Sequence, residues 1–212
     1  MEQPSIYFDN FTLYEPITVL TNLILSALCL AFCLRLGKLH ARYWPMFFCL
    51  LSFSAFFGAL GHGLYPDKNN ILQLISRMGI IIAVCLGSIA SICFLTNKNF
   101  KLFLNVFSLT QLFVAITLIV LFNNFLIVKW DGILGLGVIM GSVHIYLSIK
   151  GNRGSLFILY GIALNSIAGL VHRFQISPNK WFNYNDLGHV ILMAGFYLMA
   201  TGALRLQHYV TK

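Results

Sequence analysis

Residues 16–35 read PITVLTNLILSALCLAFCLR, an apolar run with no charged side chain before Arg35. A helix of about 20 residues crosses the roughly 30 Å hydrocarbon core of a bilayer, so this run predicts a transmembrane helix. Comparable runs recur along the chain and are interrupted by polar residues or by glycine and proline. They predict seven spans, at residues 16–35, 43–65, 71–96, 100–122, 132–149, 154–174 and 186–205.

The composition agrees with a membrane protein. Of the 212 residues, 58% are hydrophobic and 9% are charged, with a mean hydropathy of +0.81. These values exclude an ordinary soluble domain. Because seven spans use almost the whole length, we expect one all-α transmembrane domain, a seven-helix bundle over residues 1–212. The net charge of +8 comes from basic residues dispersed over short connections, which argues against nucleic acid as a partner.

The basic residues predict how the bundle is oriented, because connections rich in lysine and arginine stay in the cytoplasm. Nine of the 14 lysines and arginines fall on one side of the predicted bundle and four on the other. We therefore expect the N-terminus outside and the C-terminus in the cytoplasm, in the inner membrane of a bacterium, or in the plasma membrane or an endomembrane of a eukaryote. The nine are Arg35, Lys38, Arg42, Lys98, Lys101, Lys150, Arg153, Arg205 and Lys212, and the four are Lys68, Lys129, Arg173 and Lys180.

Ionisable side chains within spans are costly and usually face the bundle interior, so their positions guide the search for function. His62 lies late in the second span, in GALGHGLY, and His172 closes the sixth. Asp186 and His189 open the seventh span, and Glu15 precedes the first. All five lie toward the outer side in the predicted topology, so we expect the functional site there.

The start of the last span has the spacing of an oriented histidine. Asp186 and Asn185 precede His189 by three and four residues, so both can reach its ring along one helix face. A partner on one ring nitrogen fixes the tautomer and leaves the other nitrogen for a metal. Three histidines with an open fourth position suit catalytic zinc, and His62, His189 and His172 could supply them.

Other polar residues are interpreted differently. We expect Arg77, at the start of the third span, to pair with a carboxylate such as Glu15 or Asp186, or with a lipid phosphate. The short stretch 123–131 is interpreted as a connection that carries Asp131 on the outer side. The histidines on the inner side are excluded from the site, since two lie in basic surroundings typical of the surface and the third, His144, has no evident acidic neighbour. They are His40, His144 and His208.

This pattern resembles the superfamily of seven-helix membrane hydrolases that includes alkaline ceramidases and the progestin and adipoQ receptors. The resemblance covers the seven-span plan, Glu15-Pro16, a histidine late in the second span, and Asn-Asp-Leu-Gly-His at 185–189. It implies zinc held by one histidine of the second helix and two, four residues apart, on the last helix. It also implies a metal-activated water that cleaves a lipid amide. His62 and His189 match two of the ligand positions.

Three positions depart from that family. Met193 stands where the second histidine of the pair would be, which makes His172 the nearest third ligand. Gly58 stands where the family has a serine, four residues before the second-helix histidine. The third span carries Arg77 and lacks the family's aspartate.

We therefore expect a ceramidase-like membrane protein that acts as a zinc-dependent hydrolase of a lipid amide or ester. Zinc would be bound by His62, His189 and His172. Asp186 would orient His189 or transfer protons, and Glu15 would be a supporting carboxylate. Two alternatives stay open: a receptor or small-solute transporter with a polar pocket at the outer end, and a haem protein with paired axial histidines. No pattern in the sequence fixes the oligomeric state.

Overall fold

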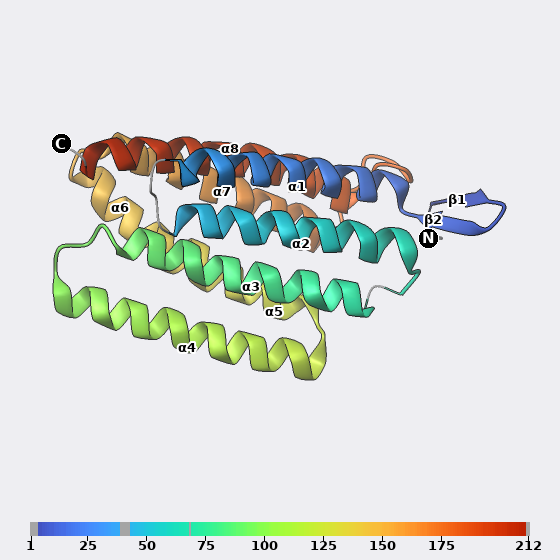
Figure 1. The fold of residues 1–212 in the computed structure, drawn as a ribbon, viewed down its shortest axis with the longest axis horizontal. Helices are drawn as coiled ribbons and strands as arrows, with labels where there is room; N and C mark the ends of the chain where they lie inside the picture. Colours follow the sequence, from blue (N-terminus) through green and yellow to red (C-terminus); the bar gives the residue numbers. More distant parts are fainter. Residues whose placement is uncertain (1–3, 39–42, 68, 211–212) are drawn as a thin grey trace.

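A short β-hairpin precedes a bundle of long helices in the computed structural model (Figure 1). The structure describes residues 4–38, 43–67 and 69–210, with the backbone alone for 207–210. The elements are β1 (Ser5–Phe8), β2 (Phe11–Tyr14), α1 (Pro16–Gly37), α2 (Trp44–Leu64), α3 (Ile71–Ile92), α4 (Lys98–Phe122), α5 (Phe125–Gly132), the π-helix η1 (Ile133–Met140), α6 (Gly141–Ile149), α7 (Arg153–Phe174) and α8 (Tyr184–Val210).

Within the described residues, seven helical segments are long and apolar enough to cross a membrane, with α5, η1 and α6 counted as one. The prediction of seven spans is therefore confirmed. By helix length and composition the chain is a multi-pass integral membrane protein. The orientation of the termini and the choice of membrane stay predictions.

Capping residues explain where the helices begin. Pro16 lies in the first turn of α1, where its missing N–H costs nothing. The side chains of Asn70, Asn97 and Asn152 accept backbone N–H groups at the starts of α3, α4 and α7. The helix α3 ends four residues before the predicted 96, and the cap at Asn97 then starts α4.

The fifth span begins earlier than the sequence analysis placed it. Asn123 adopts the left-handed conformation that ends α4, and the Asn124 side chain accepts the Leu126 N–H at the start of α5. The predicted connection 123–131 is therefore reduced to two residues. As a consequence Asp131 lies inside a membrane-spanning segment and is 4% exposed.

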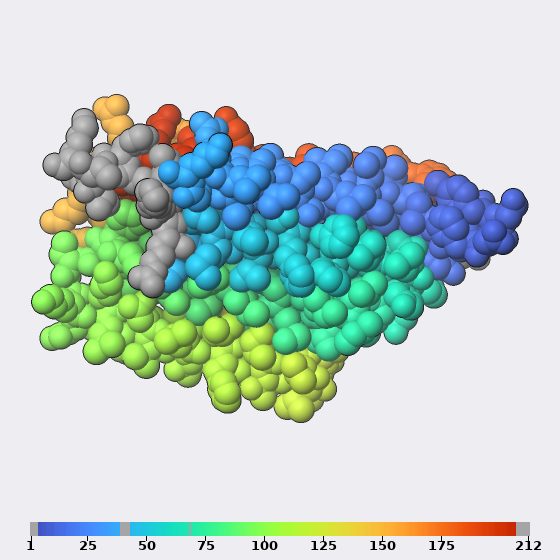
Figure 2. Space-filling model, viewed as in Figure 1, coloured from blue at the N-terminus to red at the C-terminus, as the bar shows by residue number. Residues whose placement is uncertain are grey.

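The N-terminal hairpin was not predicted. Strands β1 and β2 pair antiparallel, with Phe8 opposite Phe11 and their rings stacked 4.6 Å apart. The two residues between them, Asp9 and Asn10, form the turn. Figures 1 and 2 show the hairpin projecting past the helices.

The hairpin marks one end of the bundle, which we call the hairpin end. The helices α1, α3, α5 and α8 start there, and α2, α4 and α7 finish there (Figure 1). The helix α1 packs between α2 and α8, α3 packs against α2 and α4, and α7 packs against α8. Basic residues gather at the opposite end, as the sequence predicts: Arg35, Lys38, Lys98, Lys101, Lys150, Arg153 and Arg205.

An aromatic core fills the half of the bundle away from the hairpin. Trp44, Phe47 and Phe48 of α2 are at most 2% exposed and contact one another edge-on or stacked. Phe196 of α8 packs edge-on against Phe47 and Phe48. This apolar packing joins α2 to α8. The hairpin-end halves of the same two helices carry polar side chains.

Candidate functional site

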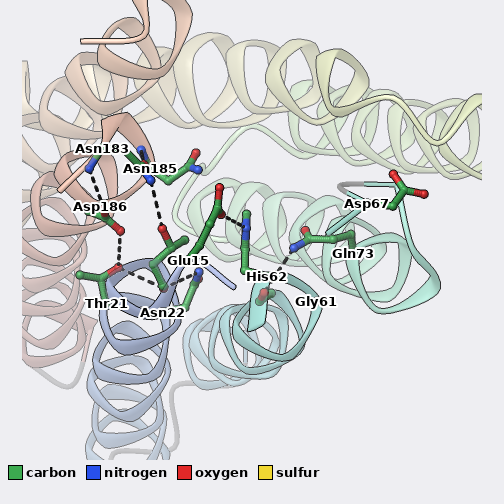
Figure 3. Close-up of polar contacts among 12 residues, drawn as sticks. Glu15, Thr21, Asn22, Gly61, His62, Asp67, Gln73, Asn183, Asn185 and Asp186 are labelled. Atoms are coloured by element: carbon green, nitrogen blue, oxygen red, sulfur yellow. Dashed lines mark hydrogen bonds and ion pairs between the residues drawn. The ribbon is translucent and has the colours of Figure 1, made fainter. Parts of the chain in front are cut away.

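Polar side chains from α2, α8 and the start of α1 meet at the hairpin end (Figure 3). We call them the hairpin-end cluster: Glu15, Thr21, His62, Asp186 and His189. In the view of Figure 3, Glu15 lies between His62 on one side and Thr21 with Asp186 on the other. Four of these five residues were predicted from the sequence.

Glu15 and His62 form the first contact of the cluster. The Glu15 Oε2 atom lies 2.6 Å from His62 Nδ1, with Glu15 3% exposed and the His62 side chain 17% exposed. A carboxylate removed from water needs a strong partner, and the imidazole N–H supplies it. The pair therefore joins the start of α1 to the last turn of α2.

The backbone aims Glu15 at this contact. Glu15 adopts the left-handed conformation, with φ of 43°, although it is not a glycine and precedes Pro16. Such a conformation costs of order 1–3 kcal/mol and occurs often at functional sites. Two backbone bonds hold it: the Glu15 N–H donates to the Pro4 carbonyl, and the Glu15 carbonyl accepts from the Val19 N–H.

His189 is anchored through a hydroxyl. Its Nδ1 lies 3.0 Å from Thr21 Oγ1, and the same oxygen lies 3.4 Å from Asp186 Oδ1 and 3.1 Å from the Thr18 carbonyl. We predicted that Asp186 could reach His189 directly along α8. Among the described residues Asp186 instead reaches the ring through Thr21, because its other oxygen is turned to the start of its own helix.

Asp186 also caps α8. Its Oδ2 accepts the Asn183 backbone N–H at 2.7 Å, while Asn183 Oδ1 accepts the Asn185 N–H at 2.7 Å. This reciprocal pattern is a capping box, and a carboxylate in the first turn also favours the helix dipole. Asp186 is 0% exposed, so its two oxygens serve the cap and the cluster together.

Two candidate residues lie outside the cluster. His172 packs between the rings of Phe125 and Tyr184, at 4.9 and 5.1 Å between ring centroids. Arg77 donates to Asn69 and Asn123, so it connects the α2–α3 and α4–α5 loops. The roles that the sequence suggested for His172 and Arg77 stay predictions.

The three-histidine zinc set does not form within the part of the chain that the structure describes. No group of three or more His, Cys, Asp or Glu side chains there could hold a metal ion. His62 and His189 have the anchoring that metal-ligating histidines have, and His172 packs against the rings of Phe125 and Tyr184. Met193, at the position of the missing histidine, packs against the apolar core.

Gly58 has a structural explanation. A Cβ atom at this position would lie 3.3 Å from Ser76 Oγ and 3.4 Å from Asn22 Oδ1. Polar atoms of α1 and α3 therefore fill the space that a side chain at Gly58 would need. The ceramidase superfamily has a serine at this position.

Thr21 was missed by the sequence analysis. Hydroxyl residues are common in membrane helices and usually bond to their own helix, so Thr21 alone gave no signal. Asn183 could have been found, since Asn183 and Asp186 have the spacing of a capping box.

A family model matches residues 17–208, which include nearly all of the helical bundle. The chain belongs to this family of unknown function (DUF6962). No curated protein and no solved structure matches the chain. The family match therefore gives the chain relatives but brings no substrate or partner.

Proposed function

We propose that the hairpin-end cluster binds the polar head group of a membrane lipid through His62 and His189, in a receptor-like or carrier-like protein. One observation carries this proposal. Each histidine is fixed through Nδ1, and neither Nε2 has a hydrogen-bond partner among the described residues.

The partners define the tautomers. An ionised Glu15 can only accept, so His62 Nδ1 carries the proton that it donates. Thr21 has one hydroxyl hydrogen, and both the Thr18 carbonyl and the Asp186 carboxylate can only accept it. With Asp186 ionised, the Thr21 hydroxyl can both donate and accept only if it accepts from His189 Nδ1. In a neutral ring the remaining Nε2 carries a lone pair, so two histidines present hydrogen-bond acceptors.

Two acceptors select a ligand with donors, namely hydroxyl or amide N–H groups. The His62 side chain is 17% exposed and residue His189 is partly exposed, while Glu15 and Asp186 are buried, so we expect the ligand to reach the histidines and not their supports. A site at the end of membrane-spanning helices is reached most simply from the bilayer. The expected ligand is a lipid with hydroxyl and amide groups, the class that the resemblance to ceramidases also suggests.

The test is binding of a fluorescent short-chain ceramide to the full-length protein in nanodiscs. His62→Gln and His189→Gln keep a donor for the Nδ1 partner and remove the second ring nitrogen. Each should weaken binding about 10-fold, the equivalent of one lost hydrogen bond of about 1.4 kcal/mol. His172→Gln is the matched control and should bind like the wild type. Unchanged affinity in both cluster variants would refute the proposal.

A zinc-dependent hydrolase is the second candidate. The anchoring of both rings through Nδ1 favours it, because ligand histidines are oriented in this way. Such zinc needs three protein ligands, and within the described residues no three His, Cys, Asp or Glu side chains come together to hold a metal ion.

Elemental analysis of the purified protein separates the two candidates. About one zinc per chain, lost in His62→Gln and in His189→Gln, together with cleavage of the ceramide probe, would replace lipid binding by hydrolysis. Ceramide binding without stoichiometric zinc supports the first candidate.

A further inference from the structure

A second polar cluster lies inside the bundle, between α4 and α5, and does not depend on the proposed lipid site. Asp131 is the penultimate residue of α5 and is 4% exposed. It lies six residues after the helix begins, which is about 9 Å along the helix axis. A buried carboxylate within a membrane span is costly unless a partner or a function retains it.

Gln111 of α4 forms a hydrogen bond with one of the two oxygens of this carboxylate. Its Nε2 donates to Asp131 Oδ1 at 2.7 Å and to the Asp131 backbone carbonyl at 2.9 Å, which uses both amide hydrogens. Asp131 Oδ2 and Gln111 Oε1 are buried, and neither has a hydrogen-bond partner within the described residues. The hydrogen-bonded pair therefore carries two unsatisfied acceptor oxygens.

The surroundings add oxygen atoms and no positive charge. Ser108, one turn before Gln111 on the same side of α4, is 2% exposed, and its hydroxyl also lacks a partner in the described part of the chain. No described lysine, arginine or histidine forms an ion pair with Asp131. The cluster has acceptors in excess of donors, and an ionised Asp131 has no positive charge to balance it among the described residues.

The backbone beside the cluster is unusual. The π-helix η1 begins two residues after Asp131 and packs closely against α3: a Cβ on Gly135 would lie 2.1 Å from Val84 Cγ1 and 3.3 Å from Gln111 Nε2. π-Helical segments are rare and frequently mark functional sites. At Gly135 the Gln111 side chain of α4 therefore lies close against the backbone of η1.

From these observations we propose that Asp131 and Gln111 bind a small monovalent cation, with Na⁺ as the ion. Oxygen ligands select hard cations. A single carboxylate is neutralised by a single positive charge, whereas a divalent ion would leave excess charge in an apolar bundle. Asp131 Oδ2 and Gln111 Oε1 would be ligands, and Ser108 Oγ is the next oxygen on the same helix face.

The experiment is thermal unfolding of the full-length protein in nanodiscs, with choline chloride replaced stepwise by NaCl or KCl at constant ionic strength. Binding to the folded state should raise the midpoint saturably in NaCl, by about 2–4 °C at five times Kd. Asp131→Asn keeps the shape of the side chain and should abolish the shift. Asp67→Asn, at an exposed acid in the α2–α3 loop, is the control and should retain it.

A second variant keeps the test decisive if Asp131→Asn fails to fold. Gln111→Met removes one proposed ligand and should raise the Na⁺ concentration at half-maximal shift about 10-fold. A wild-type midpoint that is the same in NaCl and choline chloride would overturn the proposal. So would a shift retained in full by Asp131→Asn, or by Gln111→Met where Asp131→Asn does not fold.

Discussion

Two histidine environments in this bundle differ in one decisive respect. His144 of α6 is 0% exposed, and both ring nitrogens are bonded: Nδ1 to Ser155 Oγ at 3.1 Å and Nε2 to Ser91 Oγ at 3.0 Å. His62 and His189 are bonded through one nitrogen each and are partly exposed. The first ring fastens three helices together, whereas the other two keep a nitrogen for a ligand.

The comparison shows what separates a structural histidine from one that can bind. An acidic neighbour is a weaker guide than an incomplete set of hydrogen bonds. Ser91 donates to the Gly87 carbonyl, so His144 Nε2 must donate to Ser91 and Nδ1 must accept from Ser155. Neither ring nitrogen of His144 is left to bind a ligand or a metal. The variants that follow test this contrast, from the largest expected effect to the smallest.

His144→Ala should cause the largest loss of stability. It opens a cavity and leaves the Ser155 hydroxyl buried without its partner, at a total cost of about 3 kcal/mol. The unfolding midpoint should fall by about 6–12 °C for a chain of this length. Thermal unfolding in nanodiscs measures this, with His172→Ala as the control. A fall no larger than that of the control would contradict a structural role.

His62→Gln should show the opposite pattern. Glutamine can still donate to Glu15, so the free energy of unfolding should change by less than about 1 kcal/mol. Ceramide affinity should fall about 10-fold, because the second nitrogen is lost. Unfolding and binding measured on one preparation give both quantities. A large destabilisation without loss of affinity would mean that His62, like His144, has a structural role.

Glu15→Gln tests the support behind His62. The amide no longer requires the ring to keep its proton on Nδ1, so the tautomer is freed and ceramide affinity should fall about 3–10-fold. The double variant Glu15→Gln/His62→Gln should bind no more weakly than His62→Gln alone, since both changes remove one interaction. Additive losses in a double-mutant cycle would show that the two residues act separately.

Thr21→Val should have the smallest effect. It preserves the shape of the side chain and removes the hydroxyl that joins Asp186 to His189, which costs about 1 kcal/mol of stability and a few-fold in affinity. Thr21→Ser retains the hydroxyl and should restore both. Equal behaviour of the valine and serine variants would mean that the hydroxyl does not orient the ring.

The sequence analysis predicted the spans well because their signal is the number of consecutive apolar residues, which needs no tertiary information. It also identified Glu15, His62, Asp186 and His189, since costly residues in apolar runs are conspicuous. It failed at Asp131: Lys129 and Trp130 beside it look like a membrane interface, while the cap at Asn124 that starts the helix six residues earlier was overlooked.

Other features depended on partners distant in sequence. His144 gave no signal because Ser91 and Ser155, which bond it, come from α3 and α7. The packing of His172 between Phe125 and Tyr184 gave no signal either, since these rings belong to α5 and α8. The hairpin has a recognisable signal, since aromatic and β-branched residues flank the Asp9-Asn10 turn, but its four-residue strands are much shorter than the apolar runs that indicate the spans.

The π-helix η1 allows the two halves of the fifth span to face different neighbouring helices. Asp131 must face α4 while His144, on the same span, must face α3 and α7. A π-helical stretch takes more residues per turn than an α-helix, so η1 absorbs extra residues while α5 and α6 each keep their own facing. Deleting one residue from η1 would turn the two halves by about 100° relative to each other. Either Asp131 or His144 would then point into lipid.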